Sequence, residues 1–314
     1  MMSADRAADG PVFVVGCARS GTTLLQSILA QHQSLVCFPE TNVLGKVLAD
    51  LDYRRFAIRK RSLRRRVPAW AGRMLNAAGF TTVFDWDSLP GARQRLQSLG
   101  SGVPAELLPE GRRFRIRHVF REFAAILDYA ANGRRWAEKS PQNVFCLDLL
   151  HRYLTDAVFV SIVREGKANV ASLVDAGKRY DVFRSRFGGP DGIEKAVNFY
   201  NASVAMTQRH AGSRRHVIIR YEDLAGNPAL ATRPVGELLG LEFRGDTFSY
   251  RPEGIATANE PWKFSAAEIR ISASKFHRVF NRDQQEFVAA RVVDVDALFP
   301  RRIAISGDDG HASR

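Results

Sequence analysis

The stretch from Pro11 to Thr41 constrains the fold of this chain more than any other. A β-branched and aromatic run, Val12–Val15, is followed by a short loop that contains Gly16 and Gly21. Apolar residues then recur at the spacing of one helix face, at Leu24, Leu25, Ile28 and Leu29. The first N–H groups of a helix lack partners inside the helix, so a loop of this kind can wrap an anion. The pattern predicts a strand, an anion-binding loop and a helix; an ordinary strand-to-helix turn is the alternative.

The loop nearly matches the nucleotide-triphosphatase motif G-x-x-x-x-G-K-[ST]. Gly16, Gly21 and Thr23 stand at the required spacing, but Thr22 replaces the lysine. That lysine reaches the β- and γ-phosphates of a triphosphate, so its absence argues against ATP or GTP hydrolysis. A cation is present earlier in the loop, at Arg19. The loop is therefore expected to bind an anion other than a triphosphate.

The charge of the chain limits its partners. It has 314 residues, with 46 Lys+Arg against 33 Asp+Glu, a net charge of +13 and a sequence pI of about 10.1. Such a chain favours polyanions, whether nucleotide phosphates, nucleic acid, an anionic membrane surface or an acidic acceptor. Charge alone does not choose among these. We expect a single α/β domain over residues 11–305, with a flexible stretch at 1–10 and a disordered tail at 306–314.

The cysteine content and the hydropathy of the chain are typical of a cytoplasmic protein. Cys17, Cys37 and Cys146 are odd in number and lack C-x-x-C spacing, so they predict neither a disulfide framework nor a zinc site. The first residues lack a secretory signal pattern, and no apolar run approaches the roughly 18 residues of a membrane span. We therefore expect a soluble cytoplasmic protein.

Residues 41–133 read as a mostly helical insertion that covers an acceptor site. Within it, the segment 54–66 is densely basic, which fits either a solvated helix face or a surface for anionic lipid headgroups or an acidic acceptor. The segment 80–111 is richer in Pro, Gly and Ser and is expected to lie over the sheet rather than to form one of its strands. A helix is expected through Val119 and Leu127, ending near Asn132.

Two further segments repeat the strand-then-helix pattern. A short strand at Trp136 and Ala137 is expected to deliver Glu138, Lys139 and Ser140 to its end, before a helix that starts at Pro141. A second strand, Val158–Val163, precedes Arg164 and a helix that carries Ser172. In open α/β sheets the carboxyl ends of parallel strands carry the chemistry. An arginine and a serine at such an end can clamp a phosphate, although a structural salt bridge explains the arginine equally well.

The remaining elements complete an α/β pattern. We expect a helix over Ile193–Met206, a strand over Val217–Ile219, a helix from Pro228 to about Leu239 and a closing helix over Asp283–Val292. Strands that alternate with helices predict a central parallel sheet covered on both faces.

These motifs together resemble the sulfotransferases that use 3′-phosphoadenosine 5′-phosphosulfate (PAPS). The loop ARSGTTLL resembles their 5′-phosphosulfate loop, and VSIVREGKANVASLV resembles their 3′-phosphate segment, in the same order along the chain. The segments CFPET, EKSP and RYEDL resemble the tyrosylprotein branch and its bacterial relatives. The resemblance spans about 11–228 and implies a fold of the P-loop nucleotide-binding type.

The resemblance also implies roles for individual residues. Glu40 would be the general base, whereas the cytosolic branch uses a histidine; Arg19 stands where that branch has a lysine, and Lys139 would share its catalytic role. The residues that would bind PAPS, and PAP after transfer, are Arg19, Ser20, Gly21, Thr22, Thr23, Arg164, Ser172, Tyr221 and Lys275. Tyr221 could contact the nucleotide or pack at the edge of the sheet. The match of Ser274 and Lys275 to the family is weaker, because it is a single Ser-Lys-aromatic sequence near the C-terminus. No metal is implied.

The acceptor stays open on this resemblance, because a small molecule, glycan, lipid or peptide hydroxyl would each fit. A homodimer and a peripheral membrane contact through 54–66 are further expectations. A P-loop kinase is the nearest alternative, but it requires the lysine that Thr22 replaces. A basic nucleic-acid-binding protein is the second, although the basic segment has few aromatic residues for stacking on bases. We therefore expect no nucleic-acid partner.

Overall fold

A computed structural model describes residues 10–47, 83–87, 89, 91–111, 114–243, 250–251, 253–255 and 275–301. The predictions for the basic segment 54–66, for Ser274 and for the tail 306–314 lie outside these residues, as does nearly all of the expected flexible stretch 1–10.

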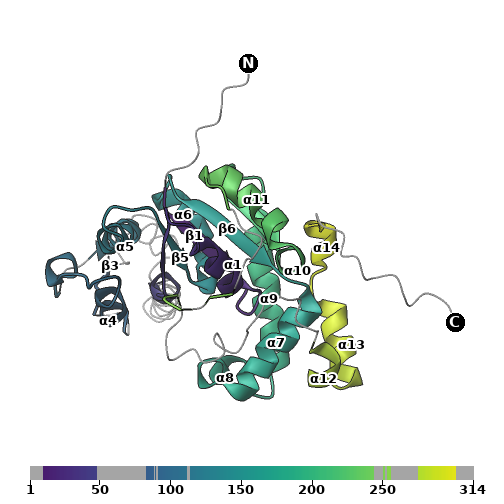
Figure 1. Cartoon of the computed structure of the whole chain (residues 1–314). Coiled ribbons are helices and arrows are strands. Elements are labelled where there is room, and N and C mark those ends of the chain that lie inside the picture. The colour runs from purple at the N-terminus through teal and green to yellow at the C-terminus, as the bar shows by residue number, and fades with distance from the viewer. Residues whose placement is uncertain are drawn as a thin grey trace, which may run out of the picture.

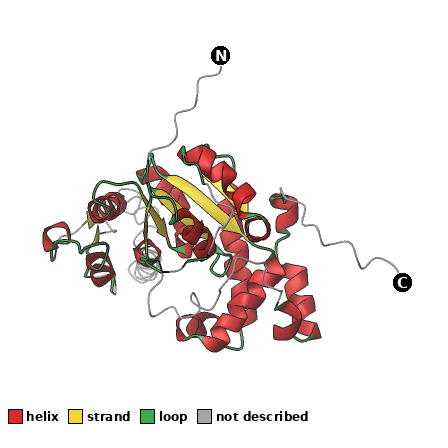
Figure 2. Ribbon diagram, viewed as in Figure 1, coloured by secondary structure: helices red, strands yellow, loops and turns green. Residues whose placement is uncertain are grey.

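Five of the described strands form a sheet in the order β2-β5-β1-β6-β7, and every pair in it is parallel. The strands are β1 (Val12–Gly16), β2 (Val36–Phe38), β5 (Trp136–Lys139), β6 (Val158–Val163) and β7 (His216–Arg220). Figures 1 and 2 show helices packed on both sides of this sheet. The predicted α/β architecture with a parallel central sheet is confirmed.

The side chains of β1 point alternately to the two faces of the sheet and contribute to a separate apolar cluster on each face. Phe13 and Val15 join one cluster with α5 (Ile116–Ala130) and α6 (Leu147–Tyr153). Val12 and Val14 join another with α1 (Thr22–Leu29) and α11 (Pro228–Leu239). Side chains of a strand alternate between faces, so one apolar run supplies both layers. The continuous apolar run of β1 is the expected consequence.

A third apolar cluster lies beyond the carboxyl end of β6. It joins α7 (Gly166–Arg179), α8 (Asp181–Phe187) and α9 (Gly192–Arg209) to the C-terminal helices. Figure 1 shows α7 and α8 below the sheet, with α12 and α13 beside α7. The C-terminal helices are α12 (Phe276–Val279), α13 (Arg282–Arg291) and α14 (Val295–Leu298).

Some elements differ from the sequence prediction. β2 was not predicted, because three residues are too few to show a period, and its place depends on pairing with β5. A short helix, α10 (Tyr221–Gly226), separates β7 from α11 where only a turn was expected. The segment from Pro141 begins as a 3₁₀ helix, η2 (Pro141–Cys146), before α6. The other predicted helices and strands are confirmed to within a few residues.

The insertion is not purely helical. Residues 43–47, α4 (Ala92–Gln97) and η1 (Ala105–Leu107) are helical, but β3 (Val83–Phe84) pairs antiparallel with β4 (Phe114–Arg115) in a separate ribbon. Buried Trp86, Leu89 and Leu96 pack in the same cluster as α5. In the part of the chain that is described, no helix is both long and apolar enough to cross a membrane.

Candidate active site

The loop between β1 and α1 leads into a helix whose start has no side-chain cap. Gly21 is the N-cap of α1 in the left-handed region, and no side chain caps this helix. Within the described residues, no acceptor is recorded for the N–H groups of Gly21, Thr22, Thr23 and Leu24. The Ser20 hydroxyl is fully buried and has no hydrogen-bond partner among the residues that the structure describes. An uncapped helix start with unpaired donors suits a phosphate or sulfate group.

Gly21 also allows a close approach that another residue would block. Its φ is +103°, and a Cβ built there would lie 2.5 Å from Cδ2 of Tyr221. We predict that Gly21→Ala destabilises the fold by at least about 1–3 kcal/mol, the cost of this backbone region for a non-glycine residue, and weakens anion binding. Thermal unfolding and nucleotide titration measure the two effects.

Gly133→Ala is a matched control for this variant. Gly133 has a φ of +69°, but nothing lies within 4 Å of its added Cβ. The control variant should carry the backbone strain alone and bind nucleotide normally. Equal effects at both positions would contradict the role assigned to the contact between Gly21 and Tyr221.

The residues predicted to hold the two phosphates of the nucleotide lie together. Nε of Arg19 donates to Oγ of Ser172 at 3.4 Å, and Nη1 of Arg164 donates to the carbonyl of Arg19 at 3.2 Å. Burial lowers the pKa of the Arg19 guanidinium; Tyr180 and Asp175 oppose this, whereas Arg164 adds to it. Two guanidinium groups held close together repel each other, and an anion bound between them would relieve this repulsion.

Tyr221 joins this group through its ring. It is 8% exposed, and the Arg164 guanidinium lies over the ring, 4.5 Å from its centroid. The ring also packs against Gly21 and within the α1 side of the core. The two alternatives for Tyr221 are therefore not exclusive, since the ring fills the core and supports the cation at the same time.

Glu40 and Lys139 form an ion pair at the ends of two neighbouring strands. Nζ of Lys139 lies 2.5 Å from Oε2 of Glu40, with side-chain exposures of 0% and 17%. Lys139 pairs in register with Val14, so its side chain leaves β5 on the same face as α1. Glu40 follows β2, which pairs with β5. The two residues are 99 positions apart in the chain, and the sheet brings them together.

A network of buried polar groups supports this ion pair. Glu138, on the opposite face of β5, accepts hydrogen bonds from Thr41 Oγ1 at 2.8 Å and Ser140 Oγ at 2.5 Å. Ser140 accepts from the N–H of Asn42, whose side-chain amide donates to Glu40 at 2.7 Å. Burial raises the pKa of Glu138, although the bonds from Ser140 and Thr41 oppose this shift.

Sequence reasoning missed this role of Asn42. The residue has a φ of +53°, which asparagine tolerates better than most residues. An asparagine two residues after a candidate base, at a turn, was the available signal. The contacts imply that Thr41, Asn42 and Glu138 hold the backbone that carries Glu40.

Lys275 reaches α7 one turn beyond Ser172. Its Nζ lies 2.5 Å from Oδ2 of Asp175, and Arg179 contacts the other oxygen at 3.0 Å. Burial works against the charge of Asp175, but Lys275 and Arg179 hold its pKa below the ordinary value. Lys275 is thus near the predicted nucleotide end, with its charge paired to a carboxylate.

The ring of His151 stacks on that of His210, with centroids 4.4 Å apart, beside α6 and α9. Across the described residues, no group of three or more His, Cys, Asp or Glu side chains is placed to hold a metal ion.

A profile of a known protein family matches most of this chain. The profile described as "Sulfotransferase family" matches residues 11–245, about three quarters of the chain. A search of curated proteins found no match.

Two solved structures have a similar fold. The sulfotransferase domain from the curacin biosynthetic pathway has a TM-score of 0.51 and 17% identity, covering 90% of this chain and 96% of its own. The sulfotransferase domain of the Synechococcus PCC 7002 olefin synthase has a TM-score of 0.51 and 16% identity, covering 90% and 94%. At this identity the likeness concerns the fold alone.

The matched residues, 11–245, include the β1–loop–α1 unit and the segment around Arg164. The chain belongs to the sulfotransferase family, and the resemblance seen in its motifs is confirmed. This family places the protein among transferases of sulfuryl groups rather than with the kinase or nucleic-acid-binding alternatives.

Proposed function

We propose that this protein transfers a sulfuryl group from PAPS to an acceptor hydroxyl. The observation that carries the proposal is the arrangement along the carboxyl edge of the sheet. The uncapped start of α1 lies between a cationic end, with Arg164 and Ser172, and an ion pair, Lys139 with Glu40. In this arrangement the start of α1 would bind one phosphate, Arg164 and Ser172 a second anionic group, and Glu40 with Lys139 would supply the acid–base pair.

The residues present fit the two anionic groups of PAPS. The N–H groups of Gly21 to Leu24 and the threonine hydroxyls would hold the 5′-phosphosulfate. Arg164 and Ser172 would hold the 3′-phosphate, the group that distinguishes PAPS from ATP. Thr22 in place of the lysine of triphosphatases supports the same choice.

Glu40 is the proposed general base. Sulfuryl transfer needs an acceptor oxygen to attack sulfur in line, with loss of the hydroxyl proton and with charge growing on the leaving oxygen. Lys139 Nζ contacts one oxygen of the Glu40 carboxylate at 2.5 Å and holds it at the strand ends. Asn42 Nδ2, at 2.7 Å, orients the other carboxylate oxygen.

Lys139 and Arg19 are the proposed electrostatic stabilisers. Lys139 is fully buried, so its charge acts with little screening by water on negative charge that develops beside it. Arg19 lies in the loop between β1 and α1, where burial lowers the pKa of its guanidinium and a bound anion would favour the charged form.

The donor assignment has a direct test. Transfer of labelled sulfate from PAPS into a cell extract, followed by identification of the labelled product, would reveal both the activity and the acceptor class. The acceptor remains one of a small molecule, glycan, lipid or peptide hydroxyl. Absence of transfer, together with no binding of adenosine 3′,5′-bisphosphate, would overturn the proposal.

Arg164→Met should abolish most of the preference for a 3′-phosphate. A charge-assisted hydrogen bond contributes about 1.5–3 kcal/mol, so adenosine 3′,5′-bisphosphate should bind about 10- to 150-fold more weakly, with adenosine 5′-monophosphate little affected. Calorimetric titration of both nucleotides measures this change. Arg233→Met, on the exposed face of α11 and paired with Glu237, is the control for loss of one positive charge. An unchanged preference in Arg164→Met would refute the clamp.

A further inference from the structure

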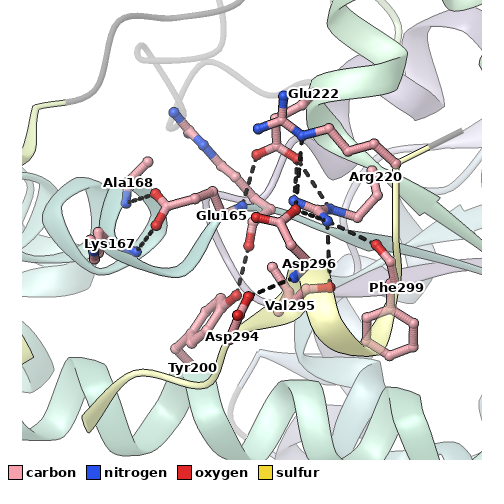
Figure 3. A network of polar contacts seen from close by, with 12 residues as sticks. Glu165, Lys167, Ala168, Tyr200, Arg220, Glu222, Asp294, Val295, Asp296 and Phe299 are labelled. Carbon is pink, nitrogen blue, oxygen red and sulfur yellow. Dashed lines mark hydrogen bonds and ion pairs between the residues drawn. The ribbon is translucent and has the colours of Figure 1, made fainter. Parts of the chain in front are cut away.

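The junction between β6 and α7 is held by two buried side chains from other elements. Tyr200 of α9 donates its hydroxyl to the carbonyl of Arg164 at 2.7 Å, and Glu222 of α10 accepts from the N–H of Glu165 at 2.8 Å. Tyr200 is 0% exposed and Glu222 6%. Figure 3 shows Tyr200 and Glu222 approaching this junction from opposite sides. The carbonyl and the N–H of the single Arg164–Glu165 peptide group therefore both have fixed partners.

Glu165 extends this control to the start of α7. Its side chain accepts from the N–H groups of Lys167 and Ala168, at 2.9 and 2.6 Å, and so caps the helix. Ser172 lies on the same helix, two turns further along. The bond from Glu165 N–H to Glu222 thus orients both the backbone of Arg164 and the helix that carries Ser172.

Arg220 holds Glu222 in place. Its Nε donates to Oε2 of Glu222 at 3.2 Å, which leaves Oε1 for Glu165. The same guanidinium donates to Asp296 Oδ1 at 2.6 Å and to the carbonyl of Phe299 at 2.8 Å. Arg220 is 3% exposed, so its charge is desolvated and depends on these partners. Figure 3 shows Arg220 between Glu222 and the α14 turn.

Tyr221, between these two residues, supports the other end of Arg164. Its ring lies under the Arg164 guanidinium, while the carboxylate next to it in the chain fixes the backbone after Arg164. The tripeptide Arg220–Tyr221–Glu222 therefore contacts the side chain of Arg164 through Tyr221 and the N–H of the next residue, Glu165, through Glu222. The first contact is with the Arg164 side chain, and the second is with the peptide group that follows Arg164.

We propose that Glu222 is a positioning residue for Arg164, and that Arg220 and the α14 turn hold Glu222 in the orientation this requires. The inference rests on the proposed function, in which Arg164 binds the 3′-phosphate of the nucleotide. Glu222 itself does not touch the nucleotide in this role. Its effect is on the discrimination between nucleotides with and without a 3′-phosphate.

The test is the ratio of two dissociation constants, for adenosine 5′-monophosphate and adenosine 3′,5′-bisphosphate. Glu222→Ala should lower this ratio about tenfold, since a charge-assisted contact is weakened rather than removed. Glu222→Gln keeps an acceptor for the Glu165 N–H and should restore the ratio to within about threefold of the wild type. A partly unfolded variant loses affinity for both nucleotides equally, so the ratio separates positioning from stability.

A second variant, Tyr200→Phe, tests the same proposal if Glu222→Ala does not fold. Tyr200→Phe removes only the hydroxyl that binds the Arg164 carbonyl and should lower the same ratio by a smaller factor, about threefold. Thr232→Val is the matched control, since it removes a buried hydroxyl that donates to the Pro228 carbonyl within α11. It should lower the melting temperature without changing the ratio.

The outcomes distinguish this inference from the proposed function. A wild type that binds both nucleotides equally would overturn the 3′-phosphate clamp itself. A wild type that discriminates, together with Glu222→Ala and Tyr200→Phe variants that discriminate as well, would overturn the positioning role alone. A reduced ratio in both variants, with an unchanged ratio in Thr232→Val, is the expected result.

Discussion

Replacing Glu40 with glutamine should lower the turnover number by about 10²- to 10⁴-fold, the usual contribution of a general base. The amide is nearly the same size as the carboxylate, but it cannot accept the acceptor proton at neutral pH. Affinity for adenosine 3′,5′-bisphosphate should stay close to that of the wild type, because the proposed phosphate ligands are the loop, Arg164 and Ser172, and Glu40 is not among them. Steady-state kinetics with PAPS and titration of the bisphosphate measure the two quantities.

The ion pair adds a structural cost that the experiment must separate. Lys139 is fully buried, so the glutamine variant leaves its charge without this carboxylate and should unfold at a lower temperature. The turnover number is therefore calculated per folded molecule, with the folded fraction measured by nucleotide binding. Glu237→Gln, which removes an exposed carboxylate paired with Arg233, is the control for the same chemical change. Retention of full turnover in Glu40→Gln would remove Glu40 from the role of base.

Replacing Lys139 with methionine should lower the turnover number by about 10²- to 10³-fold, as removal of one preorganised electrostatic contact does elsewhere. Methionine has a similar length and suits the buried position, so packing is largely kept. The loss arises because only one of the two proposed cations, Arg19, then balances the charge that develops on the transferred group. Single-turnover kinetics at saturating PAPS measure this effect on the chemical step.

Lys195→Met is the matched control for Lys139→Met. Lys195 is half exposed and pairs with Asp191 on α9, so its replacement should leave turnover within about twofold. The double variant of Glu40 and Lys139 should lose less than the sum of the single losses, since the two residues act as a pair. Turnover in Lys139→Met within tenfold of the wild type would contradict the stabilising role.

Much of the fold is predictable because its signals are local. β6 has the predicted bounds, Val158–Val163, and α11 has the predicted bounds, Pro228–Leu239. An apolar β-branched run predicts the strand, while a proline at the start and a glycine just after the end predict the helix. The phosphate loop is also local, since Gly16, Gly21 and the helix after them are consecutive in the chain.

The candidate site is predictable only as a set of separate motifs. The three-residue strand β2 has no detectable period, yet its pairing with β5 is what places Glu40 beside Lys139. Likewise, Asp296 reaches Arg220 from 76 positions away, through the packing of α14. Contacts of this kind depend on which strands and helices become neighbours, and no local pattern records that choice.

The sequence by itself determined the chemistry of the anion-binding loop, with Thr22 in place of a lysine and Arg19 as its cation. It also determined the family, because those motifs follow one another in a fixed order. Only the tertiary structure decided that Glu40 pairs with Lys139 and that Glu222 holds the backbone beside Arg164. The physical reason is that a parallel sheet gathers the carboxyl ends of distant strands at one edge, where burial makes each pairing of charges necessary.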